Sequence, residues 1–402
     1  MSVNIQTIKE FITTIPFNKV TIRELLAFPK TSVNILLAVV IVSFVVLFFV
    51  GVGIYLVHGH HAYNVTREHP WGLLIAVYIF FVVSSTGLCI VGSLGDVFGF
   101  KDYMEISKRA IFGSIVTIVA GFAVIAFEIG HPVTMLIYNI LTPGFTSAIW
   151  WMGTLYGLYL TFMIIEFVFL LKHDMKMAKI FGLSGLLIGL AAHSNLGGVF
   201  GFLNARTISN GVFYPTYFIL TAFITGIYLA YIMYGFRYKL NFTPSGTKLL
   251  VNLGKIQALL LSILIFFVTW KMLTDIYGGM PNRAEVAIHI LGSMTFWAEV
   301  ILAMIIPLFI ILKSGGANIR AMFWASLSGM VGIFFMRYNL VHDTQLKPLQ
   351  MLKITEYQLA PTWVEYFPSG TEIMISLGGL GICLALYYVG TKVFNLDETI
   401  AH

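Results

Sequence analysis

Ten segments of this chain are each long and apolar enough to cross a lipid bilayer. The hydrocarbon core of a bilayer is about 30 Å thick, so a spanning helix needs about 20 mostly apolar residues. The segments lie at 33–57, 71–98, 110–130, 147–171, 178–200, 213–236, 250–275, 285–312, 321–338 and 371–392. Because helices satisfy their own backbone hydrogen bonds within lipid, we predict an all-α, polytopic membrane protein whose transmembrane domain covers residues 33–393.

The charge and cysteine content narrow the class of protein further. Charged residues make up 10% of the chain, whereas soluble proteins carry about 25%, so we expect a lipid environment and no nucleic-acid partner. Cys89 and Cys383 lie in separate apolar segments and are too few for a disulfide framework, a zinc site or an iron–sulfur cluster. No C-x-x-C-H motif is present, which excludes covalently attached haem c. We therefore expect no metal site in this chain.

Lysine and arginine gather at one end of the predicted spans. Of the 24 lysines and arginines, 17 lie in the N-terminal tail, in the loops that follow the second, fourth, sixth and eighth spans, or in the C-terminal tail. Cytoplasmic loops carry such an excess, so we predict that both termini are cytoplasmic, in the inner membrane of a bacterium or archaeon. Residues 1–32 form a long amphipathic stretch without a small-residue cleavage site, and we interpret them as a cytoplasmic segment.

This orientation places most of the unusual polar residues close to the outer surface. Ionisable groups within a span are costly, so each is a functional candidate. The outer layer contains Glu128, His131, Trp150, Trp151, His193, Asp275, Tyr277, Arg337, Asn339, His342, Asp343 and Glu372. Glu299 is expected near the middle of its span, and Asp96 and Glu166 toward the inner side.

Three similarities suggest that the chain contains an internal repeat. First, Thr-Gly occurs at 86–87 and at 225–226, each time at the same distance after a tyrosine. Second, the third and seventh spans each have an acid at the outer end. Third, the fourth and eighth spans each contain tryptophan. An offset of four helices preserves orientation, so these would be parallel repeats. We predict two four-helix bundles, at about 71–200 and 213–338, flanked by helices 1 and 10. Chance similarity between apolar segments is the alternative.

Four kinds of chemistry compete to explain the outer polar layer. A haem b anchor needs facing histidine pairs, but only His193 lies well inside a span. An ion or proton transporter could use Glu299, Asp96 and Glu166 as a relay, although the halves contain no matched pair of broken helices. A quinone site needs hydrogen-bond donors and proton-exchanging groups at one depth beside an apolar slot, which the layer supplies. The structural alternative is that these residues only cap helices, with Arg337 and Asp343 as a weak surface ion pair.

Several motifs, in their order along the chain, carry a resemblance to a known family. They are "FEIGHP" at 127–132, "WWMG" at 150–153, "HS" at 193–194 followed by "FGFLNAR" and "YPTYFILTAFITG", "TDIYGG" at 274–279, "RYNLV" at 337–341 and "PTWVEYFPSGTEIMISLG" at 361–378. Through them the chain resembles the polysulfide reductase membrane-subunit family, also called NrfD-like, over about residues 35–392. It is most similar to the ten-helix branch, which includes the membrane subunits of hydrogenase 2-type enzymes, the quinone reductase complex and alternative complex III. One departure is His131, which stands where an arginine is common.

The resemblance implies the membrane subunit of a respiratory oxidoreductase complex, without a haem, cluster or redox metal of its own. Such a subunit exchanges electrons between menaquinone or ubiquinone and an extracytoplasmic, ferredoxin-like iron–sulfur subunit with four clusters, in either direction, with or without proton translocation. A hydrogenase, a molybdoenzyme or a multihaem cytochrome c would be the further catalytic subunit. The outer segment 344–369 would help to dock the partner.

The resemblance also implies roles for particular residues. His193 or His131 would exchange protons with the quinone or hydrogen-bond to it, and Arg337 would stabilise developing negative charge. The remaining candidates are Glu128 and Asp275 as orienting or proton-passing groups, Trp151, Tyr277 and Asn339 as cofactor-binding residues, and Glu299, Asp96 and Glu166 as a proton path toward the inner face. His342 and Asp343, further out, are interpreted as partner-docking or proton-entry residues.

Overall fold

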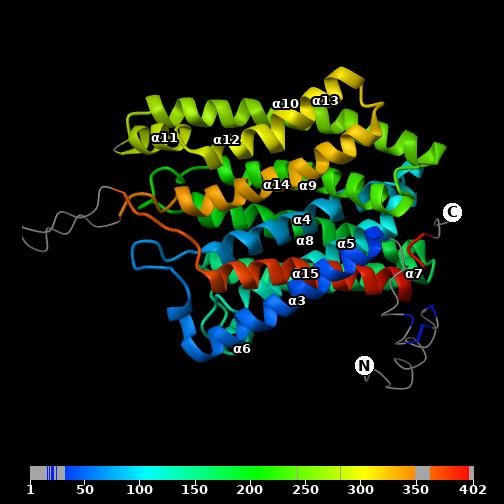
Figure 1. Ribbon diagram of the computed structural model, residues 1–402, viewed down its shortest axis with the longest axis horizontal. Helices are drawn as coiled ribbons and strands as arrows, with labels where there is room; N and C mark the ends of the chain where they lie inside the picture. The colour runs from blue at the N-terminus through cyan, green and yellow to red at the C-terminus, as the bar shows by residue number, and fades with distance from the viewer. Residues whose placement is uncertain are drawn as a thin grey trace, which may run out of the picture.

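The structure contains the long apolar helices that the sequence predicts. The computed structural model describes residues 32–241, 243–280, 282–348 and 363–397, together with residues 16, 18, 20, 21 and 24. Within these residues, 10 helices are long and apolar enough to span a membrane, and no strand occurs. They run alongside one another in one bundle (Figure 1). The prediction of an all-α, polytopic membrane protein is therefore confirmed, while most of segment 1–32 lies outside the described residues.

The spanning helices and the short helices between them follow one another along the chain. The spans are α3 (Ser32–His58), α4 (Leu73–Asp96), α5 (Met104–Ile125), α7 (Ala148–Leu171), α8 (Met175–Gly201), α9 (Phe213–Tyr238), α10 (Pro244–Tyr277), α12 (Met294–Val300) continued by η3 (Ile301–Ile305) and α13 (Ile306–Ser314), α14 (Ile319–Asp343) and α15 (Gly370–Val393). The short elements are η1 (Gly59–Ala62), η2 (Lys101–Tyr103), α6 (Pro132–Leu141) and α11 (Arg283–Leu291). We call the end where α3 begins and α15 ends the terminal end, and the opposite end the far end (Figure 1).

Several bounds differ from the predicted ones. Helix α14 continues to Asp343 instead of ending at residue 338, because "YNLVHD" contains neither glycine nor proline, so its polar residues lie on the helix itself. The third span ends at Ile125, which leaves Glu128 in the turn that follows. The predicted segment 285–312 divides into α11 and a span that begins at Met294, after the side chain of Ser293 caps it.

Two groups of four spans have the same neighbours. In unit one (α4, α5, α7 and α8), α4 and α7 each pack on α5 and α8. In unit two (α9, α10, α12–α13 and α14), α9 and α13 each pack on α10 and α14. The central helices α4 and α9 cross at Gly87 and Gly226, where a Cβ atom on Gly87 would lie 2.6 Å from the Gly226 nitrogen. These are the glycines that the sequence comparison pairs, and we propose on this basis that the two units are repeats.

Helices α3 and α15 pair with each other beside the two units. Helix α3 packs on α15, and α15 packs on α5 and α4, along the lower edge of the bundle in Figure 1. Small residues allow the close approach: a Cβ atom on Gly378 would lie 2.3 Å from Phe48 Cβ, and one on Gly381 would lie 2.6 Å from Phe44 Cβ. Helices 1 and 10 therefore flank the units together, as a pair, and the glycines on one face of α15 allow α3 to pack closely against it.

A π-helical turn, η3, interrupts the eighth span directly after Glu299. Pro307 has no N–H group to donate to the Ala303 carbonyl four residues earlier. The Tyr228 hydroxyl donates to that carbonyl instead, at 2.5 Å. Gly332 lets α14 approach the same turn, since a Cβ atom there would lie 2.3 Å from the Ala303 nitrogen. The turn is thus held from two neighbouring helices.

Candidate functional site

His193 and Arg337 lie together in the centre of the bundle, on two helices that both pack on α9. Both side chains are fully buried. The His193 ring lies 5.4 Å from the Phe218 ring, and the Arg337 guanidinium lies 4.8 Å from the centre of that same ring. The Tyr156 hydroxyl and His193 Nδ1 form a 3.0 Å hydrogen bond, and Arg337 Nη2 donates to the Thr221 hydroxyl. We call this group the His–Arg centre.

Three nitrogens of the His–Arg centre lack a hydrogen-bond partner among the described residues. They are Arg337 Nε, Arg337 Nη1 and His193 Nε2. A buried polar group without a partner costs about 1–3 kcal/mol, so such groups are few in folded proteins. Arginine only donates, and His193 Nε2 is a donor in the tautomer whose Nδ1 accepts from Tyr156. The centre can therefore bind an acceptor atom such as a carbonyl oxygen.

Glu299 belongs to the same layer instead of the middle of the membrane. Because its span begins at Met294, Glu299 lies in the first two turns of α12. Its Oε1 accepts from the Tyr217 hydroxyl at 3.3 Å, and its Oε2 accepts from Asn339 Nδ2 at 2.9 Å. Tyr217 also lies beneath the Arg337 guanidinium, 5.7 Å from it. The acid and the guanidinium thus share a neighbour, although no ion pair joins them within the described part of the chain.

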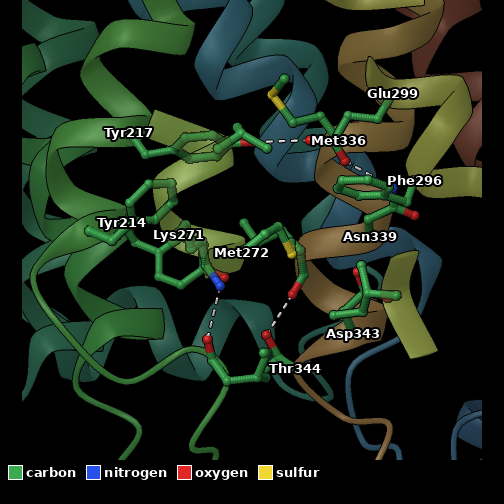
Figure 2. A pocket seen from close by; sticks show the side chains of 15 residues that line it. Tyr214, Tyr217, Lys271, Met272, Phe296, Glu299, Met336, Asn339, Asp343 and Thr344 are labelled. Atoms are coloured by element: carbon green, nitrogen blue, oxygen red, sulfur yellow. Dashed lines mark hydrogen bonds between the residues drawn. The ribbon is translucent and has the colours of Figure 1, made fainter. Parts of the chain in front are cut away.

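A cavity of about 50 Å³ lies beside Glu299, within unit two. Tyr214 and Tyr217 face it from α9, Lys271 from α10, Glu299 from α12, and Asn339 and Asp343 from α14 (Figure 2). A water molecule needs roughly 10–15 Å³ of such space and two to four polar partners. The cavity can therefore hold a few water molecules between polar groups of four helices.

Asp275 is held by two cations at the far end of α10. Its Oδ2 pairs with Lys271 Nζ at 2.5 Å and its Oδ1 with Arg283 Nε at 2.7 Å, and the aspartate is fully buried. Lys271 also donates to the Ile208 carbonyl at 3.3 Å. Asp275 therefore holds Lys271 at the wall of the cavity, and the structure separates it from His193.

Glu128 lies in a different group, at the far end between α5 and α15. Burial, followed by the charge of Glu372, raises the pKa of Glu128 to about 7, while the Gly72 amide opposes the shift. One Glu128 oxygen is buried without a partner among the described residues. Glu372 accepts hydrogen bonds from the amides of Asn64, Leu73 and Ser369 and from the hydroxyl of Tyr366. The two acids therefore fasten the 63–72 segment to the start of α15.

Three predicted site residues are exposed at the surface of this chain. His131 precedes α6 and is exposed, Trp151 is 38% exposed with its indole N–H donating to the Phe145 carbonyl, and Tyr277 is 81% exposed. No described contact joins any of them to His193 or Arg337. Their roles as catalytic or cofactor-binding residues stay predictions.

Asp96 and Glu166 adjoin each other near the terminal end, on α4 and α7, and both are buried.

His342 and Asp343 lie on the last turn of α14. His342 Nδ1 is 3.2 Å from Nε2 of His69, whose ring stacks on Tyr366, so its surroundings differ from those of the cavity-lining Asp343.

Sequence reasoning missed Tyr156, Tyr217 and Lys271. The two tyrosines have the pattern of ordinary residues in apolar helices, whereas Lys271 is a charged residue within the predicted span 250–275, a signal that could have found it. One signal links the two central residues. The stretches "LSGLLIGLAAHSNL" at 183–196 and "LSGMVGIFFMRYNL" at 327–340 both begin with Leu-Ser-Gly and, after nine further residues, end with Asn-Leu. This alignment places His193 opposite Arg337 and Asn195 opposite Asn339. The two halves of the His–Arg centre therefore occupy equivalent positions of the two proposed repeats.

The fold and the His–Arg centre together define a polytopic membrane protein with a polar site inside its helix bundle. A family model described as "Polysulphide reductase, NrfD" matches residues 60–348, and the chain belongs to this family. Similar proteins include a selenate reductase subunit from Mesobacillus selenatarsenatis, 23% identical over 384 residues that cover 83% of this chain and 88% of the relative. The Hdr-like menaquinol oxidoreductase integral membrane subunit of Archaeoglobus fulgidus is 27% identical over 350 residues, covering 83% and 86%. Both relatives are named as subunits of oxidoreductases.

Proposed function

We propose that this chain is the quinone- or quinol-reacting membrane subunit of a respiratory oxidoreductase complex, with its reaction site at the His–Arg centre. The observation that carries the proposal is the set of three buried nitrogens on Arg337 and His193 that lack a partner among the described residues. The donor chemistry of these nitrogens fits a carbonyl oxygen, which a quinone headgroup presents. A bound quinone supplies two-electron, two-proton chemistry. The name of the archaeal relative, which includes menaquinol, supports the same class of ligand.

Each residue of the centre has a distinct role in this proposal. Arg337 donates hydrogen bonds to a headgroup oxygen and stabilises negative charge there, in surroundings without competing water. His193 Nε2 gives or takes a proton at that oxygen, while Tyr156 holds Nδ1 and so fixes the orientation of the ring. Asn339 and Tyr217 hold Glu299 beside the centre, where it can exchange protons with the cavity. The cavity has room for a few water molecules, which can carry these protons.

The partner and the orientation follow from the same proposal. We infer that the far end faces outward and docks an extracytoplasmic iron–sulfur subunit, which exchanges the electrons. The described part of the outer segment is fixed to the far end of the bundle. The Trp363 ring stacks on the His289 ring at 4.1 Å, and Lys347 Nζ lies 3.9 Å from the centre of the Trp363 ring. Residues 349–362 of the predicted docking segment lie outside the described residues. The basic residues then lie at the cytoplasmic, terminal end, as the charge distribution predicts.

Turnover of the intact complex tests the proposed site. Removing one charge-stabilising donor typically costs about 10²–10³ in rate, so Arg337→Met should lower quinone-linked turnover by about 100-fold, and His193→Gln should also lower it. Arg320→Met is the matched control, because Arg320 lies on the same helix with its side chain exposed. Co-purification with the partner subunits shows whether each variant assembles. Assembled Arg337→Met and His193→Gln complexes with wild-type turnover would refute the site.

Two other functions, a transporter and a haem anchor, make different predictions. A transporter would move ions in liposomes without partner subunits and would not respond to quinone analogues. A haem anchor requires histidines on opposite sides of an iron. The described close pair, His69 and His342, has ring nitrogens only 3.2 Å apart and in contact with each other. This geometry leaves no room for an iron between the two rings, so this pair does not support a haem anchor.

A further inference from the structure

The buried polar groups of unit one form a file that leads from the terminal end toward His193. We propose that these side chains conduct protons between a carboxyl pair, Asp96 and Glu166, and His193. The inference rests on the proposed function, since it assumes that His193 exchanges protons with a quinone. We call the file the proton column, and its members are Asp96, Ser93, Cys89 and Ser85 on α4, Ser114 on α5, Glu166, Tyr159 and Tyr156 on α7, and His193 on α8.

The column begins at two carboxyl groups that lie within hydrogen-bonding reach of each other. None of their four oxygens has a well-formed hydrogen bond to a donor of the described residues, although the amides of Asp96 and Val97 approach the Asp96 carboxyl. Two adjacent, buried carboxylates repel each other strongly, and a proton on one turns it into a donor to the other. The pair therefore holds one shared proton.

The fold makes room for this pair instead of neutralising it. A Cβ atom on Gly182 of α8 would lie 2.4 Å from Glu166 Oε1, so only glycine leaves space for the acid. No lysine, arginine or histidine of the described residues hydrogen-bonds to either carboxyl. A buried acid pair with no hydrogen-bonded cation in the described part of the chain is costly, which favours a functional role over a structural one.

The middle of the column is a cluster of hydroxyl groups around Tyr159. Tyr159 Oη lies 2.7 Å from Ser114 Oγ and 3.1 Å from Ser85 Oγ. Its hydroxyl also approaches the Cys89 thiol, which contacts Ser93 Oγ at 4.0 Å, one turn from Asp96. All of these side chains are essentially fully buried. The cluster therefore continues the line of exchangeable protons from the acid pair toward the centre of the bundle.

The upper part of the column reaches the His–Arg centre through Tyr156. The rings of Tyr156 and Tyr159 are 6.4 Å apart, and Tyr156 Oη hydrogen-bonds to His193 Nδ1. From Glu166 to Tyr156 the column rises about 15 Å, at about 1.5 Å per helical residue. It has two gaps, between Ser93 and the acid pair and between the two tyrosines. A water molecule or a side-chain rotation must carry the proton across each gap.

Proton conduction along the column conserves charge at every step. Each hydroxyl or thiol gives its proton to the next group and receives another from the group behind it. When His193 takes a proton from the centre, one proton leaves the acid pair at the other end, and the reverse holds for proton uptake. The electrons do not follow this route; they pass to the redox partner subunit of the proposed function.

Turnover of the intact complex in H₂O and D₂O tests the column. Tyr159→Phe and Glu166→Gln should each slow quinone-linked turnover at least tenfold and raise the solvent isotope effect, because proton transfer becomes limiting. The affinity for a quinone analogue, measured by equilibrium binding, should not change. Tyr231→Phe is the matched control, because Tyr231 is a fully buried tyrosine of unit two whose hydroxyl donates to the Leu250 carbonyl, away from the column.

The outcomes separate this inference from the proposed function. If Tyr159→Phe and Glu166→Gln behave like Tyr231→Phe in rate and isotope effect, the column is overturned and the quinone site stands. Ser114→Ala gives a second measurement at the same cluster should Tyr159→Phe fail to assemble, with a smaller slowing expected in the same direction. A wild-type complex that neither binds nor turns over quinone would overturn the proposed function, and the column with it.

Discussion

Glu128 couples the stability of the far end to pH through a single carboxyl. Its pKa in the folded chain is raised from 4.5 to about 7, by burial and then by the charge of Glu372. The unfolded chain therefore releases this proton first as pH rises, so the stabilisation is present below pH 4.5 and is lost as pH rises through about 7. At about 1.36 kcal/mol per pKa unit, the effect is at most about 3 kcal/mol.

Replacing Glu128 with glutamine should remove this pH dependence. As the pH rises from about 5 to about 8, the apparent Tm of the wild-type chain should drop by several degrees relative to the Tm of Glu128→Gln at the same pH. The pKa of His69 is lowered to about 4, so its contribution has the opposite sign and is lost as pH falls. Comparing the two chains at each pH cancels that contribution. Parallel Tm curves for wild type and variant would show that Glu128 does not titrate differently on folding.

At the scale of the elements, the crossing of α4 and α9 depends on two glycines. A Cβ atom on Gly87 would lie 2.1 Å from the Ala222 carbonyl oxygen, so one helix must shift. Gly87→Ala should therefore lower the stability of the chain by about 1–3 kcal/mol, the usual cost of overpacking. Gly157→Ala on α7 is the control, since nothing lies within 4 Å of a Cβ atom there. Gly157→Ala should be neutral or slightly stabilising, because alanine favours helix by about 1 kcal/mol. Equal Tm values for the two variants would contradict the crossing geometry.

The elements also show what the sequence could predict. Hydropathy located all ten spans, since length and apolar content decide whether a helix can cross lipid. It could not place the π-helical turn at Ile301–Ile305, because that turn depends on Tyr228 and Gly332 from other helices. Hydropathy also ends the ninth span at residue 338, because the polar residues that follow lower the apolar content, whereas α14 continues to Asp343 with Asn339 buried in the bundle.

The candidate site was predictable in part, for a related reason. Charge and residue type single out His193, Arg337 and Glu299 in an apolar chain, and the structure brings all three into one layer. The same criteria singled out Glu128, His131 and Asp275, which lie elsewhere. Depth along a helix can be read from sequence only where the ends of the span are predicted correctly, as they were not for Glu299. The direction in which a side chain points around the helix depends on packing. Tyr156 was missed because nothing local distinguishes it, whereas the charge of Lys271 within its span is a signal that could have found it.

At the scale of the whole molecule, the proposed repeat gives the two units different tasks at equivalent positions. His193 of unit one and Arg337 of unit two meet at the centre, so neither unit alone completes the site. Unit one contains the proton column toward the terminal end, and unit two contains the water-sized cavity beside Glu299 and Lys271. A quinone at the centre would thus lie between a proton path and a hydrated cavity, with its electrons passing outward to the partner.

The most direct test of this account is a cryo-EM structure of the intact complex with a bound quinone analogue. The account predicts a headgroup oxygen within hydrogen-bonding distance of Arg337 Nε or Nη1, with His193 Nε2 in reach of the same headgroup. A headgroup bound away from both residues, such as beside the exposed Trp151 or Tyr277, would contradict it.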